Sequence, residues 1–68
     1  MTTTNIIEGL QLINKSKPEG KSDYHFRAEH DEIWAGSLDW PMSVEDKKRM
    51  EELGWMTDED ADGWVAYI

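Results

Sequence analysis

The chain is short, strongly acidic and free of cysteine. Its 68 residues hold 15 Asp or Glu against 7 Lys or Arg, a net charge of −8. A chain of this length forms one small domain over residues 1–68 and buries only about 60% of the surface of its unfolded form. Without cysteine there is no disulfide and no thiolate metal site, and no apolar run approaches the roughly 18 residues of a membrane span. We therefore expect a soluble protein of a reducing cytoplasm that binds no membrane.

The N-terminal third predicts one helix and an exposed loop. Asn5, followed three positions later by Glu8, is typical of a helix N-cap. Apolar residues then recur at helical spacing on one face: Ile6, Leu10 and Ile13. Gly9 weakens the helix by up to about 1 kcal/mol relative to Ala, and a helix this short needs a partner, so its apolar face should pack on a sheet. Pro18 forbids continuation, which leaves residues 15–23 as an exposed loop.

The next stretch predicts a β-hairpin. Residues 24–29 alternate apolar and polar side chains, which is the period of a half-buried strand. A turn at His30 and Asp31 leads into a second strand at residues 32–35. Residues 38–42 are irregular, but their large apolar side chains predict a loop folded over the core.

The C-terminal half predicts a helix and a second hairpin. Ser43, followed three positions later by an Asp, resembles a capping box, so a helix should begin at Val44. Gly54 supplies the left-handed residue that ends it. Two strands led by tryptophan follow at residues 55–57 and 64–68, and the acidic segment between them ends in Asp-Gly, a strong turn signal.

These elements predict an α+β domain with the order α-β-β-α-β-β, in which two helices pack on an antiparallel sheet of two hairpins. Both helices and both hairpins contribute to the predicted core. Its residues are Ile6, Leu10, Ile13, Phe26, Trp34, Leu53, Trp55 and Trp64.

Two patterns resemble metal sites but lack part of what such sites need. Residues 58–63 match the opening of an EF-hand calcium loop, yet the bidentate Glu of its twelfth position would fall past Ile68, and a strand follows instead of a helix. His25 and His30, with acidic neighbours, could bind zinc or nickel, but the pattern places one on a strand face and the other in a turn. We expect an acidic turn and a solvated strand face, with no metal and no cofactor.

Catalysis by paired carboxylates is not expected either. Such chemistry needs two acids with separated pKa values in a cleft, and a chain this short leaves little room for a cavity of roughly 300 Å³ or more. The sequence also lacks a serine-histidine-acid pattern and a glycine-rich phosphate-binding pattern. We therefore expect that the protein is not an enzyme.

The acids are concentrated toward the C-terminus. Residues 1–28 hold three acids and four bases, whereas residues 29–68 hold twelve acids and three bases. Aromatic residues accompany these acids, unlike in disordered acidic segments, so the acids should lie on a folded surface. Such a surface can occupy a basic nucleic-acid channel of another protein, because the same Lys and Arg side chains attract carboxylates and phosphates. The alternative is that the acids only confer solubility while the tryptophans fill the core.

Two segments carry a resemblance: AEHDEIWAGS at 28–37 and SVEDKKRMEELGWMTDEDADGWVAYI at 43–68. They resemble small proteins encoded by phages and prophages, in which an acidic helix ends in a Leu-Gly-Trp turn before a Trp-led last strand. In size, acidity and lack of cysteine the chain is also similar to phage anti-CRISPR proteins, a class that includes acidic mimics of DNA. This resemblance implies binding to a bacterial CRISPR surveillance complex at its basic DNA-binding surface, in the host cytoplasm.

We therefore expect a non-enzymatic, anti-CRISPR-like inhibitor, a monomer or weak dimer, that binds a bacterial nucleic-acid-binding protein such as a Cas subunit and does not bind nucleic acid directly. The candidate partner-binding residues, chosen by charge, are Glu29, Asp31, Glu32, Glu51, Glu52, Asp58, Glu59, Asp60 and Asp62. Two alternatives stay open. One is a small calcium-responsive module built on the turn at 58–63, and the other is an interaction protein of phage origin that forms a homodimer through exposed tryptophans.

Overall fold

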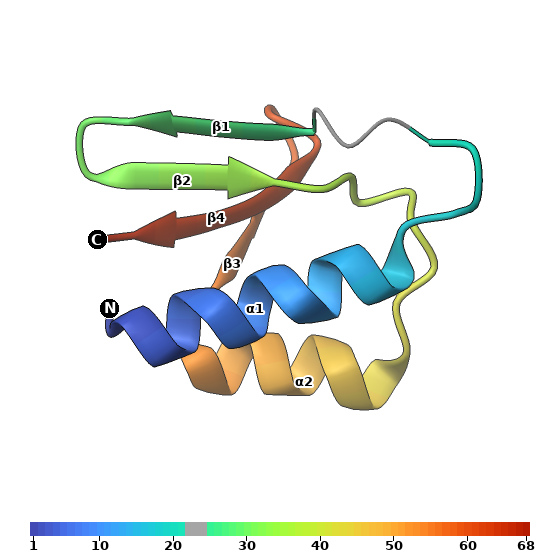
Figure 1. The fold of residues 1–68 in the computed structure, drawn as a ribbon, viewed down its shortest axis with the longest axis horizontal. Helices are drawn as coiled ribbons and strands as arrows, with labels where there is room; N and C mark the ends of the chain where they lie inside the picture. Colours follow the sequence, from blue (N-terminus) through green and yellow to red (C-terminus); the bar gives the residue numbers. More distant parts are fainter. Residues whose placement is uncertain (22–24) are drawn as a thin grey trace.

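The computed structural model describes residues 1–21 and 25–68, and in these ranges two helices lie side by side against one face of a four-stranded sheet (Figure 1). The elements are α1 (Thr3–Ser16), β1 (Phe26–Glu29), β2 (Glu32–Ala35), α2 (Val44–Leu53), β3 (Met56–Asp58) and β4 (Gly63–Tyr67). The predicted α+β class and the order α-β-β-α-β-β are confirmed. Within the described ranges, neither helix has the length and apolar character needed to cross a membrane. Tyr24, the first residue of the predicted first strand, lies outside the described residues.

The sheet is antiparallel, with the strand order β1-β2-β4-β3. Consecutive strands form the two predicted hairpins, and the hairpins join where β2 pairs with β4. Trp34 lies opposite Val65 in this central pairing, and Trp64 lies opposite Thr57 in the second hairpin. β1 and β3 are therefore the edge strands.

The start of α1 corrects one prediction. The helix begins at Thr3, and its N-cap is Thr2, whose hydroxyl accepts a hydrogen bond from the Asn5 amide at 3.1 Å. Asn5 is not the cap, because the Thr2 hydroxyl already satisfies a free N–H group of the first turn. α2 begins and ends as predicted, with Ser43 as its N-cap and Gly54 at a φ of 100° after its last turn.

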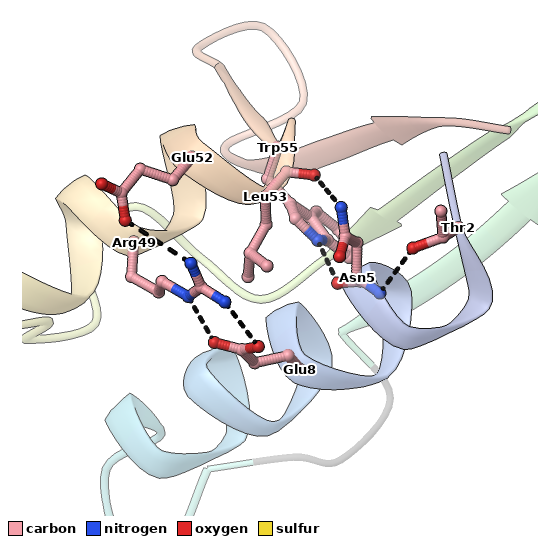
Figure 2. Close-up of polar contacts among 7 residues, drawn as sticks. All are labelled: Thr2, Asn5, Glu8, Arg49, Glu52, Leu53 and Trp55. Atoms are coloured by element: carbon pink, nitrogen blue, oxygen red, sulfur yellow. Dashed lines mark hydrogen bonds and ion pairs between the residues drawn. The ribbon is translucent and has the colours of Figure 1, made fainter.

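Asn5 instead joins the start of α1 to the end of α2 (Figure 2). Its Nδ2 donates a hydrogen bond to the Leu53 carbonyl, and its backbone carbonyl accepts one from Trp55 Nε1, both at 3.1 Å. The first bond satisfies a carbonyl that a helix end leaves without an intrahelical partner, and the second satisfies the buried indole. The indole lies so close to Gly9 that a Cβ atom there would overlap it. Gly9 thus lowers the intrinsic stability of the helix, but it leaves the space that the Trp55 ring fills.

The core lies between the helices and the inner face of the sheet. Its buried apolar residues are Ile13, Ile33, Ala35, Trp40, Met50, Leu53, Trp55, Trp64 and Ala66. Four predicted core residues are among them, and Ile6 and Leu10 pack against this cluster while partly exposed. The burial of Trp40 confirms that the irregular segment at 38–42 folds over the core.

Two predicted core residues lie elsewhere. Phe26 faces the helical side of the sheet, because it is paired with the buried Ala35, yet it is 52% exposed. Every residue of β1 is exposed, since β1 is the edge strand farthest from the helices (Figure 1). Trp34 points to the opposite, outer face of the sheet, because its neighbour Ile33 points into the core. On that face the Arg27 guanidinium lies 4.4 Å from the centroid of the Trp34 ring.

Candidate functional site

The predicted acids fall into separate groups rather than one continuous row. One group lies at the β1–β2 turn and another at the β3–β4 turn, at opposite ends of the sheet (Figure 1). The register shows this, because Glu32 lies opposite Tyr67 at the end of β4, whereas Asp58 lies opposite Gly63 at its start. The first group is Glu29, Asp31 and Glu32, and the second, which we name the acidic turn (residues 58–62), holds Asp58, Glu59, Asp60 and Asp62.

Two carboxylates of the acidic turn hold its backbone in place. Asp58 Oδ1 accepts hydrogen bonds from the amides of Asp60 and Ala61, at 3.0 and 3.2 Å. Asp62, with a φ of 52°, accepts a hydrogen bond at Oδ2 from the Ser37 hydroxyl at 2.9 Å. Ser37 is buried, so this bond anchors the turn to the interior.

The other two carboxylates of the turn, Glu59 and Asp60, point into solvent. Both residues are exposed, and neither has an ion pair with a base among the described residues. Glu51 of α2 lines the same hollow as Glu59, a depression of about 280 Å³ that Lys47 also borders. The fold therefore brings Glu51 and Glu59 together, and Asp60 follows Glu59 in the turn. We name Glu51, Glu59 and Asp60 the exposed acidic group.

Glu52 is paired within α2, with the arginine that also bridges to α1 (Figure 2). Arg49 donates hydrogen bonds from Nε and Nη2 to the two carboxylate oxygens of Glu8, at 2.6 and 3.0 Å, and its Nη1 lies 3.6 Å from Glu52 Oε1. Lys15 and Asp46 form a second pair between the helices at 3.1 Å. Glu52 is thus already paired with a cation, unlike the exposed acidic group.

The ion pair between the helices makes stability depend on pH. Hydrogen bonds from Arg49 lower the pKa of the Glu8 carboxyl below its ordinary value of 4.5, against an opposing effect of desolvation, and the charge of Arg49 adds to the lowering. The folded-state pKa lies below the unfolded one, so the stabilisation is fully present above about pH 4.5 and is lost as the pH falls through the lowered pKa.

Glu8→Gln should therefore lower the melting temperature at neutral pH and leave it close to that of the unmodified protein in strong acid. The reason is that acid protonates Glu8 and removes the same pair. Circular dichroism melts across the acid range measure this, with Glu19→Gln as the control that removes an exposed carboxylate elsewhere. A Glu8→Gln deficit of equal size at neutral and strongly acid pH would contradict the assignment.

The structure does not arrange these residues as a metal site. Within the described part of the chain, no group of three or more His, Cys, Asp or Glu side chains is placed to hold a metal ion. Asp58 directs an oxygen to amides of its own turn. His25 packs against Trp40 with ring centroids 5.2 Å apart and the ring planes tilted by 56°, and His30 lies in the β1–β2 turn with a φ of 51°. The two histidines thus flank opposite ends of β1.

The tryptophans are mostly inside. Trp40, Trp55 and Trp64 are buried, and Trp34 alone is partly exposed, on the outer face of the sheet. A homodimer built on several exposed tryptophans therefore has only Trp34 to use.

The surface carries two open grooves of about 440 and 450 Å³. Each exceeds the roughly 300 Å³ for which the chain was predicted to leave little room. One lies between α1 and β1, and the other is bordered by β1, β2 and the acidic turn. Among the described residues, the first is lined by no carboxylate and the second by Asp62 alone, so neither supplies a pair of acids.

Comparisons with known proteins add no assignment. No protein-family model matches the chain, and no curated protein and no solved structure is significantly similar to it. The candidate site rests on the geometry of the chain itself.

Proposed function

We propose that the protein is a non-enzymatic inhibitor that occupies the basic nucleic-acid-binding surface of a bacterial CRISPR–Cas surveillance complex. It acts in the cytoplasm of the bacterial host and contacts the Cas protein, not nucleic acid. One observation carries the proposal: the exposed acidic group has no ion pair with a base among the described residues, and its turn is held by hydrogen bonds.

Carboxylates suit this role because they resemble phosphates in charge and in hydrogen-bonding capacity. Lys and Arg side chains that bind a phosphate backbone form charge-assisted hydrogen bonds with carboxylates as well. A turn that is already ordered by Asp58 and Asp62 also loses little conformational entropy on binding. Carboxylates between the helices, such as Glu8, are less suited, because they would first have to leave Arg49.

The dimensions of the molecule allow both acid groups at the ends of the sheet to take part. Its longest extent is 29 Å, which corresponds to roughly eight base pairs of DNA at 3.4 Å each. The acidic turn and the group at the β1–β2 turn would then meet separate points along one basic channel. Binding should weaken steeply with salt, because exposed charges are screened over a Debye length of about 8 Å at physiological ionic strength.

Reversing two charges of the exposed acidic group tests the proposal. The double variant Glu59→Lys and Asp60→Lys should lose inhibition by about tenfold or more, since it places cations against a basic surface. The measurement is binding of fluorescently labelled target DNA to a panel of purified CRISPR surveillance complexes, with the protein as competitor, at low and high salt. Asp58 and Asp62 are left unchanged in this variant, because their carboxylates hold the turn and their replacement would disturb it.

The matched control carries the same charge change on other exposed acids. Glu19→Lys with Glu45→Lys should retain most of the inhibition, and circular dichroism should show that both doubles are folded. Equal inhibition by the Glu59/Asp60 double and the unmodified protein would remove the acidic turn from the site. A panel in which no complex loses DNA binding would refute the proposed function.

A further inference from the structure

β1 leaves an apolar groove open at the edge of the sheet. The groove, of about 440 Å³, runs between α1 and β1. Ile7 from the helix and Phe26 from the strand border it and are 50% and 52% exposed. In a chain where 15 of 68 residues are acidic, no carboxylate is among the described residues that line this groove. The described lining of the groove therefore adds no carboxylate repulsion against a second copy.

The free edge of β1 also carries backbone groups oriented for strand pairing. The His25 carbonyl accepts a hydrogen bond at 2.8 Å from the residue after β2, so it is directed toward β2. Because backbone groups alternate in direction along a strand, Arg27 and Glu29 are also directed toward β2, and Phe26 and Ala28 are directed outward. An added antiparallel strand would bond to Phe26 and Ala28.

A second copy of the chain fits this edge in one register. In a two-fold antiparallel pair, the outward-directed residues of one β1 must lie opposite outward-directed residues of the other. Two registers meet this condition and pair three residues of each β1. One register is centred on Arg27 and the other on Ala28. The first places Arg27 opposite Arg27 of the second copy. The second places Arg27 of each copy opposite Glu29 of the other, on the outer face of the sheet. Directly opposed unlike charges stabilise a strand pair and like charges destabilise it, so charge selects the register centred on Ala28.

We propose that the protein associates with a second copy through β1, in this two-fold register, so that the sheet continues across both copies. In this register Phe26 of each copy lies opposite His30 of the other on the helical side of the sheet, so the second copy covers Phe26 and the part of the groove that it borders. Arg27 is already placed for the contact, since it lies on the outer face over Trp34.

The size of such an interface is compatible with a weak dimer. Specific interfaces bury at least about 1,000 Å² in total, or about 500 Å² on each copy, and the latter is about a tenth of the 4,727 Å² surface of one copy. This association does not depend on the proposed inhibitory function.

A charge swap tests the proposal by sedimentation equilibrium of the full chain over a wide range of concentrations. The unmodified protein should form dimers as its concentration rises. Arg27→Glu and Glu29→Arg should each raise the dimer dissociation constant about tenfold, because each creates two like-charge contacts. The double swap should restore it. Glu29→Arg is the more discriminating single variant. It reduces the net negative charge of the chain, so general electrostatics would favour association, whereas the proposed register predicts weaker association.

Two further variants separate the contact from other effects. Glu19→Arg makes the same charge change away from β1 and should leave the dissociation constant unchanged. Phe26→Ser should weaken the dimer at least tenfold while the circular dichroism spectrum keeps its shape, because Phe26 is half exposed in the single copy. A monomer at every concentration, or a dimer that survives both single charge reversals, would overturn the proposal.

Discussion

Gly9→Ala should destabilise the protein by roughly 2–4 kcal/mol, although Ala is the better helix former. The new Cβ atom would overlap the Trp55 indole, so the ring must move out of its buried position and away from the Asn5 carbonyl. A domain of this size has a total stability of only about 3–10 kcal/mol. Urea denaturation followed by circular dichroism measures the loss, and Thr4→Ala, at an exposed position of α1, is the control.

A double-mutant cycle identifies the cause. In a Trp55→Leu background the indole is gone, so Gly9→Ala should cost little or should stabilise the helix by about 0.5–1 kcal/mol. If the Trp55→Leu variant is too unstable to measure, the less disruptive Trp55→Phe replaces it as the background of the cycle. A Gly9→Ala variant at least as stable as the unmodified protein would show that Trp55 does not occupy this space.

Met50→Ala should cost about 2–5 kcal/mol, which is the range for removing a large apolar side chain from a core. Met50 is 0% exposed and packs among the residues that join α2 to the sheet. Ala preserves the helix, so the loss reports packing. Met56→Ala is the matched control, because Met56 is 49% exposed and its truncation should change the free energy of unfolding by no more than about 0.5 kcal/mol. Similar costs for both variants would contradict the placement of Met50 in the core.

Local signals predicted the elements and their order. Ser43 caps α2, and Gly54 ends the helix in the left-handed region. The first hairpin lies where apolar residues alternate with polar ones, and the second lies where the acidic turn separates two short strands. These features depend on hydrogen bonds and backbone angles within a few residues, so they can be read from spacing alone. Both ends of α1 differ from the prediction. Asn5 was predicted as the cap in place of Thr2, because both residues can cap and lie within one turn, and the helix continues to Ser16 although residues 15–23 were predicted as a loop.

Tertiary contacts decided what spacing could not show. Phe26 has the alternation of a core residue, but the helices do not extend over β1, so it stays half exposed. Ser37 and Asp62 are 25 residues apart, and no local pattern predicts the bond that anchors the acidic turn. The same holds for Gly9, whose role depends on a tryptophan from the far end of the chain.

The sequence by itself determined the α+β order and an excess of negative charge, because both follow from residue types and short-range spacing. Only the tertiary structure decided which carboxylates stay free. Arg49 neutralises Glu8, 41 residues away, and lies beside Glu52, whereas Glu59 and Asp60 face solvent on a turn held by Asp58. The physical reason is that an ion pair requires two side chains within about 4 Å, and only packing of the helices brings distant charges that close.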